Sequence, residues 1–203
     1  MKTQYFYFLG VVGVVLLIMI YVFGGTQANE NYLKKVSEFR ATKDRHFKES
    51  ENSPLDKKER KTFQGLKYYE INPAYKLEAD FIPFDIKQTI EISTSTGTSK
   101  RYQKFGYVRF TFMNIQHQLL LLKPLERGAS SIFFLAFTDE TSGKETYGGG
   151  RYLDVEIKKG KAILDFNFAY NPYCAYNSAY ECPIPPKENH LPIPILAGEK
   201  NYK

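Results

Sequence analysis

The sequence predicts a mainly β fold, either an antiparallel β-sandwich or a partly open barrel, with two short helices and one transmembrane helix before it. The chain of 203 residues contains 16 Tyr and 16 Phe but no Trp, and aromatic rings are well suited to cross-strand pairs. From Tyr68 onward, short alternating apolar runs are bounded by Gly, Pro, Asn and Ser, which is typical of an all-β domain. The third observation is a long uncharged stretch near the N-terminus.

This uncharged stretch runs from Tyr5 to Phe23. At about 1.5 Å per residue a helix of this length spans ~28 Å, close to the bilayer's hydrocarbon thickness of about 30 Å. It predicts that residues 5–23 anchor the chain in a membrane as a single pass. A secretory signal is the alternative, because Thr26-Gln27-Ala28 could be cleaved.

The orientation of this anchor is given by two opposing observations. Five basic residues between positions 34 and 45, against one lysine before the span, place the domain in the cytoplasm by the positive-inside rule. An N-terminal apolar segment before a whole domain is, however, the usual export arrangement, and we favour an extracytoplasmic domain. The expected organisation is an anchor or uncleaved signal at 1–28, two helices at 29–66, and a β-domain with a Pro-rich C-terminal wrap at 67–203.

The helices are predicted from apolar spacing and capping signals. Residues 29–50 carry apolar side chains at a near-helical period, which predicts an amphipathic helix. Ser53 as N-cap with Pro54 at the first helical position predicts a second helix from Pro54 to Phe63.

The strands are predicted from alternating or continuous apolar runs. They cover 89–95, 107–112, 118–125, 132–137, 151–157 and 162–168. Residues 114–117 are expected to form a hairpin turn, with His117 on the surface. Lys159-Gly160 is expected to be a two-residue turn, since this register places Ile157 opposite Ala162 and all apolar residues on one face.

The same register places Asp154 opposite Asp165, and Tyr152 opposite Asn167. Two carboxylates this close need a cation, a basic side chain or a shared proton, so they indicate an acidic site unless both point into water. Arg151 falls at the open end of the apolar face, where it needs a carboxylate or the anionic end of a ligand as partner. The glycines at 148–150 lack the Lys and Ser or Thr of a phosphate loop and indicate a crossover or bulge.

The cysteines lie in a proline-rich segment. Cys174 and Cys182 could form a disulfide, remain buried thiols, or act as nucleophile with His190. As metal ligands with His190 they would lack a short chelate and a fourth ligand, so neither a metal nor a cofactor is predicted. The net charge of +6 is scattered among acidic residues, which excludes nucleic acid as the expected partner.

Several motifs resemble the bacterial and archaeal family of unknown function numbered 1684. They include Thr141-Ser142-Gly143, residues 145–148 and 150–153, residues 164–167, Cys174-Ala175-Tyr176, Cys182-Pro183 and residues 197–200. The resemblance implies a mostly β domain with a shared polar cluster and no established activity. Carried over residue by residue, it points to Arg151, Tyr152, Asp165, Asn167, Tyr170, Asn171, Cys174 and Cys182.

Three functional hypotheses follow. The first is a membrane-tethered domain that binds a small polar or anionic ligand, or a cell-envelope partner, around Arg151. The second is a hydrolase that uses Asp165 with or without Cys174. The third is a purely structural polar cluster. Whether the chain is an enzyme stays open at this stage.

Overall fold

The computed structural model describes residues 27–125 and 132–203. The chain divides into two compact units, Met1–Ala41 and Thr42–Lys203, and each is described by itself. The described residues of the first unit, 27–41, are helical, and this helix continues to residue 49 in the second. The predicted membrane span at 5–23 lies outside the described residues; among those described, no helix is long and apolar enough to cross a bilayer.

Both predicted N-terminal helices are confirmed, but the second begins later than expected. Helix α2 covers Lys57–Thr62, with Asp56 as its N-cap accepting from the amides of Lys58 and Glu59. The hydroxyl of Ser53 instead accepts from the Leu55 amide and donates to the Phe47 carbonyl. Ser53 therefore closes a turn before the helix, and the carboxylate three residues later caps it.

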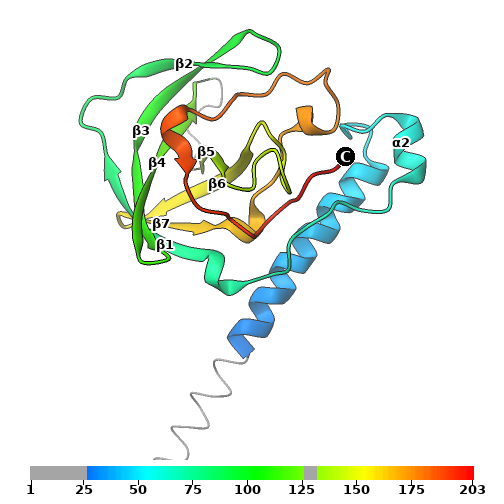
Figure 1. The fold of residues 1–203 in the computed structure, drawn as a ribbon, viewed down its shortest axis with the longest axis horizontal. Coiled ribbons are helices and arrows are strands. Elements are labelled where there is room, and N and C mark those ends of the chain that lie inside the picture. Colours follow the sequence, from blue (N-terminus) through cyan, green and yellow to red (C-terminus); the bar gives the residue numbers. More distant parts are fainter. Residues whose placement is uncertain (1–26, 126–131) are drawn as a thin grey trace, which may run out of the picture. The chain divides into compact units, whose positions relative to one another are not determined.

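The second unit is mainly β, as predicted, and its centre is a closed antiparallel barrel rather than a sandwich or an open barrel (Figure 1). The neighbouring order is β1-β7-β6-β5-β4-β3, and β3 pairs back to β1. The barrel strands are β1 (Lys76–Pro83), β3 (Ser99–Phe112), β4 (Ile115–Pro124), β5 (Ile132–Asp139), β6 (Arg151–Lys158) and β7 (Lys161–Asp165). Strand β2 (Thr89–Ser93) pairs with β3, and β8 (His190–Leu191) runs parallel to β5.

Strand β1 closes the barrel, and the sequence prediction missed it. Its first half pairs with β7 and its second half with β3. Strand β3 pairs with both β2 and β1 along one edge, because its register shifts next to Gly106. A Cβ atom at Gly106 would lie 2.4 Å from the Ile82 carbonyl oxygen. A bulge at a glycine bends a strand and lets two backbones approach closely, which here turns an open sheet into a barrel.

The barrel interior is filled by side chains. Alternate residues of the strands point inward, and they form one apolar cluster that includes Val108, Leu119, Leu135, Leu153 and Leu164. A smaller cluster on the outer face of β3 and β4 contains Ile92, Tyr102, Leu120 and Leu122. Because both faces of β4 are covered, its continuous apolar run is explained.

The hairpin between β3 and β4 turns earlier than predicted. Phe112 pairs with Ile115, and the two turn residues Met113 and Asn114 both have positive φ, as a type I′ turn requires. His117 consequently lies within β4, where it is buried beside Phe110. The prediction of a surface histidine in a turn was therefore wrong, because methionine rarely adopts the left-handed conformation that places the turn at 113–114.

The hairpin between β6 and β7 confirms the predicted turn but not the predicted carboxylate pair. Lys159 and Gly160 have positive φ, and Ile157 pairs with Ala162. The ladder between β6 and β7 ends at this pair, whereas β7 pairs with β1 along its other edge, so that Asp165 lies opposite Lys76. Asp154 is exposed and Asp165 is buried. The second strand is also shorter than predicted, because a 3₁₀-helix, Phe166–Phe168, replaces its expected end.

The C-terminal segment, residues 183–203, runs along the barrel (Figure 1). Asn189 is fully buried where β4 and β5 share only one pair, Leu122 with Phe134. Its amide nitrogen donates to the carbonyls of Leu120 and Ala136, and its oxygen accepts from the Leu120 amide at 2.7 Å. One side chain therefore supplies the ladder bonds that the separated strands cannot make.

Candidate functional site

Arg151 is completely buried and pairs with Asp139, the last residue of β5. Its Nη2 lies 2.7 Å from Asp139 Oδ2, and both side chains are 0% exposed. Phe137 and Arg151 are directly opposite on β5 and β6, and the guanidinium carbon lies 5.4 Å from the Phe137 ring centroid. Of the two partners expected from the sequence, a carboxylate or an anionic ligand, the carboxylate is the one present.

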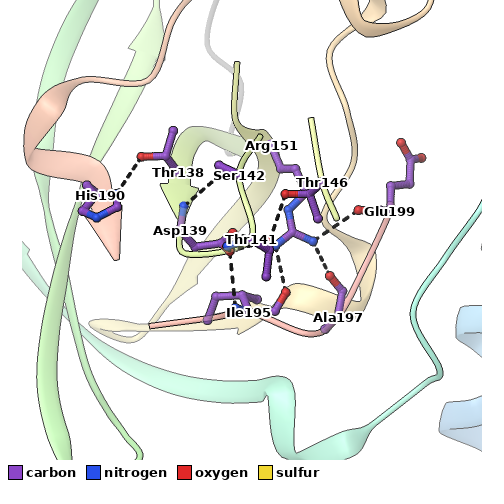
Figure 2. A network of polar contacts seen from close by, with 10 residues as sticks. All are labelled: Thr138, Asp139, Thr141, Ser142, Thr146, Arg151, His190, Ile195, Ala197 and Glu199. Atoms are coloured by element: carbon purple, nitrogen blue, oxygen red, sulfur yellow. Dashed lines mark hydrogen bonds and ion pairs between the residues drawn. The ribbon is translucent and has the colours of Figure 1, made fainter. Parts of the chain in front are cut away.

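The remaining donors of Arg151 bind the C-terminal segment (Figure 2). Nη1 donates to the carbonyls of Ala197 and Glu199, and Nη2 donates to the carbonyl of Ile195 at 2.9 Å. Four hydrogen bonds thus use both terminal nitrogens, and among the described residues Nε finds no acceptor. A guanidinium with this many protein acceptors has little capacity left for a ligand.

Asp139 also fixes the loop between β5 and β6, residues 140–150. Its Oδ1 accepts from the amide and the hydroxyl of Thr141, at 2.8 and 2.6 Å, and the Thr141 hydroxyl contacts that of Thr146 at 2.9 Å. The Asp139 amide donates to the Ser142 hydroxyl at 3.0 Å (Figure 2). The ion pair therefore joins three pieces of chain: β6, this loop and the C-terminal segment.

Tyr170 and Asn171 lie around a second buried carboxylate, that of Glu199, which is 1% exposed. The Asn171 amide donates to Glu199 Oε2 at 2.8 Å, the Tyr176 hydroxyl donates to the same oxygen, and Lys43 pairs with Oε1. The Lys43 ammonium also lies 4.8 Å from the Tyr170 ring centroid. Burial and the nearby carboxylate raise the pKa of Tyr176 well above its usual value, so its phenol stays a donor.

Asp165 and Asn167 serve a different part of the chain. Asp165 accepts from the Asn167 amide and side chain, and Asn167 exchanges two hydrogen bonds with the backbone of Asn72. They hold the turn before β1 against the turn after β7. The carboxylate and the amide therefore have a structural use here. Asp165 also has different hydrogen-bond partners from Cys174, the other residue of the predicted hydrolase.

Tyr152 follows Arg151 on β6 and therefore points to the other face of the strand. Its hydroxyl donates to the Pro183 carbonyl, and its ring packs edge-on against Phe134 and Tyr170. Burial, and then the two cysteines, raise the pKa of Tyr152 far above the usual value. The six predicted ligand-binding residues are thus bonded within the protein, Asp165 to Asn167 and Tyr152 to Tyr170 among them, and five of the six are buried.

The cysteines lie together. The backbone amide of Cys174 donates to Cys182 Sγ at 3.1 Å, and the Tyr147 hydroxyl donates to Cys174 Sγ at 3.7 Å. Both are free thiols in this structure, so the disulfide stays a prediction. His190 instead contacts Thr138 and Glu140. Within 27–125 and 132–203, no group of three or more His, Cys, Asp or Glu residues is arranged to hold a metal ion.

A shallow surface pocket of about 310 Å³ lies elsewhere, against residues 63–65. Charged side chains of the preceding helix form its other wall: Asp44, Arg45, Lys48 and Glu49. Asp44 accepts from the Leu66 amide, and burial raises its pKa. The pocket contains none of the residues predicted from the sequence.

Sequence reasoning missed Asp139, Tyr147, Asn189 and Glu199. Asp139 could have been found, because a carboxylate directly after a buried strand with Thr141 two residues later is a common turn-closing pair. Glu199 lies in the motif at residues 197–200, to which the sequence assigns no role. Nothing local distinguishes Asn189 or Tyr147, whose partners are distant in the chain.

Comparison with known proteins gives a family but no activity. The family model described as a protein of unknown function, DUF1684, matches residues 61–200. The solution NMR structure of an uncharacterized protein of Haloarcula marismortui is similar, with a TM-score of 0.68 and 32% identity over 86% of this chain and 96% of that one. No curated protein matches. The match of the family model over residues 61–200, together with this similar structure, means that the chain belongs to the DUF1684 family of proteins of unknown function.

Proposed function

We propose that the polar cluster around Arg151 is a structural brace, and that this barrel is a domain that binds an envelope partner through its surface. The observation that carries the proposal is the complete burial of the Arg151–Asp139 pair, with all four Nη hydrogen bonds made to the chain itself. A buried ion pair of this kind contributes more to a unique arrangement of segments than to net stability.

The brace also explains why these residue types are required. The C-terminal segment contains many prolines and forms only two residues of strand, so most of its carbonyls cannot enter a ladder. Three of them, at positions 195, 197 and 199, converge on one guanidinium. Arginine can satisfy several acceptors at fixed angles, which a lysine ammonium cannot do.

Two competing functions make different demands. An anionic ligand at Arg151 would have to displace Asp139 or the backbone carbonyls from a side chain with 0% exposure. A hydrolase based on Asp165 would need that carboxylate to leave its bonds to Asn167. Tethering through residues 5–23 and an extracytoplasmic location stay predictions from the sequence.

A double-mutant cycle on Arg151 and Asp139 tests the brace. Arg151→Met leaves the Asp139 carboxylate buried and unpaired, so we expect the free energy of unfolding to fall by about 3–5 kcal/mol. Asp139→Asn should also destabilise. The double variant, which contains neither charge, should be more stable than the sum of the single effects predicts, by on the order of 1–3 kcal/mol. Urea unfolding of the four proteins measures these values.

The ligand-site account predicts a different pattern. If Arg151→Met unfolds within about 0.5 kcal/mol of the wild type, as surface substitutions do, the guanidinium is not a brace. An Asp165→Asn variant is the corresponding control for the hydrolase account, since it keeps the shape of the side chain. Turnover by the wild type of an ester, glycoside or amide that this variant loses would favour the enzyme.

A further inference from the structure

We propose that Cys174 and Cys182 form a thiol–disulfide exchange site, in which Cys174 is the attacking thiol and Cys182 is the resolving thiol. The site is distinct from the brace, although the loop that Asp139 fixes also carries Tyr147. Four features of the structure support it: the contact between the two cysteines, their unequal exposure, a phenol donor to one sulfur, and a rigid frame around the other.

The frame holds Cys182 against the end of β2. The Ser95 amide donates to the Cys182 carbonyl at 2.9 Å, and the Cys182 amide donates to the Ser95 hydroxyl at 3.2 Å. The next residue, Pro183, forms a β-bridge with Thr94. Cys182 is only 7% exposed. A buried cysteine held in place by backbone hydrogen bonds is suited to be the resolving thiol, because its sulfur is not accessible to a substrate.

Cys174 is the accessible member of the pair. It lies in a 3₁₀-helix, Tyr173–Ala175, and is partly exposed. Its amide points at Cys182 Sγ, 3.1 Å away, and its own sulfur is within hydrogen-bonding reach of Cys182. The two side chains therefore lie next to each other, as an exchange between them requires.

Tyr147 supplies a donor to the Cys174 sulfur, at 3.7 Å. Its position depends on Gly149, because a Cβ there would lie 2.4 Å from Tyr147 Cε1. The glycine run at 148–150 thus lets the phenol ring fold back over its own backbone. A hydrogen bond to sulfur favours the thiolate, which is the nucleophile in disulfide chemistry.

The charges around the pair agree with this division of roles. The hydrogen bond from Cys182, together with those from Tyr147 and Ser95, lowers the pKa of Cys174 to about 6 although burial opposes it. The shared proton and burial raise the pKa of Cys182. Burial and the Cys174 sulfur raise the pKa of Tyr147 to about 12, so the phenol remains protonated and can donate. The Cys174 backbone amide and the charge of Lys100 act in the other direction and lower the pKa of Cys182, but the shared proton and burial outweigh them.

The reaction is an exchange with a low-molecular-weight or protein disulfide. The Cys174 thiolate attacks one sulfur of the disulfide, which breaks its S–S bond and releases one thiolate, leaving a mixed disulfide on Cys174. Cys182 loses its proton and attacks Cys174 Sγ, which releases the second thiolate. The two cysteines are oxidised to one intramolecular disulfide, and the partner disulfide is reduced to two thiols.

Alkylation of the reduced full-length protein tests the assignment of roles. Monobromobimane should modify Cys174 faster than Cys182, and the rate should rise with pH through a midpoint near the Cys174 pKa of about 6, not near the ordinary thiol value of about 8.5. Tyr147→Phe should move the midpoint upward and slow the reaction below it by up to about tenfold. Tyr180→Phe, which removes a phenol hydroxyl from the loop between the two cysteines, is the matched control and should leave the midpoint unchanged.

Oxidation tests the exchange itself. With glutathione disulfide, the wild type should form the intramolecular disulfide and lose the mass of two hydrogen atoms, and dithiothreitol should reverse this in the folded protein. Cys182→Ser should stop at the mixed disulfide on Cys174, and Cys174→Ser should react much more slowly. Equal alkylation rates with an ordinary midpoint, or a disulfide that dithiothreitol cannot reduce without unfolding, would overturn the proposal. Neither result bears on the Arg151 cycle, which measures stability alone.

Discussion

At the scale of single residues, this protein uses its buried polar side chains in place of regular hydrogen-bond ladders. Arg151 binds carbonyls of a proline-rich segment, Glu199 binds three donors from two segments, and Asn189 fills a gap between two strands. Buried polar groups are costly unless each finds a partner. Here they let irregular backbone be buried, because Arg151 and Asn189 each satisfy three backbone groups.

Asn189 offers a direct test at this scale. Replacement by Leu keeps the volume but leaves the Leu120 amide and two carbonyls without their partner, so we expect a loss of at least about 2 kcal/mol in unfolding free energy. Asn201→Ala removes an exposed amide that bonds the Lys144 carbonyl, and should cost less than about 0.5 kcal/mol. Urea unfolding compares them; equal costs would mean that Asn189 does not join β4 to β5.

The sequence could reveal Arg151 but not its partners. A charged residue at the end of an apolar strand face requires compensation, and this requirement was readable without a structure. Asp139 lies 12 residues before it, and Ala197 and Glu199 lie far after it, so no local pattern connects them. For the same reason the six predicted site residues could be named as polar and special, while their distribution among separate contacts could not be foreseen.

At the scale of elements, the strands with alternating patterns were predictable and those that depend on distant pairing were not. Strands β2, β5 and β6 lie close to their predicted ranges. Strand β1 was missed because its charged residues and terminal proline obscure the alternation, and its edges are both paired only once the barrel closes. The β6–β7 turn was predicted correctly, but its register could not show where the two strands separate.

Two glycines with positive φ provide a matched pair at this scale. Gly160 has φ of 75° and open space where a Cβ would lie, whereas a Cβ on Gly150, φ 82°, would lie 2.5 Å from the Phe137 carbonyl oxygen. Gly160→Ala should therefore cost only the backbone term of about 1–2 kcal/mol.

Gly150→Ala should cost a further 1–3 kcal/mol or so, because β5 or Pro185 must move. Thermal unfolding of the two variants measures the difference. If both lose the same stability, the approach of the β5–β6 loop to β5 is looser than the structure has it, and the glycine run has no steric role.

At the scale of the whole molecule, the second unit is a closed barrel whose loop and C-terminal segment are fastened at one end by Arg151 and Glu199. Barrel closure leaves no long free edge between β1 and β3–β7. The fold class was predictable from composition and alternation. Closure was not, because it depends on the bulge beside Gly106 and on β1 pairing with two strands far apart in sequence.

Hydrogen–deuterium exchange of Arg151→Lys is the most direct test of the central claim, that Arg151 is a brace. Lysine keeps the charge but cannot make the four bonds. We predict that residues 140–150 and 195–201 exchange faster together, while the β3–β4 hairpin is unchanged. Unchanged exchange in both segments, or a change confined to one of them, would contradict the claim that Arg151 joins them.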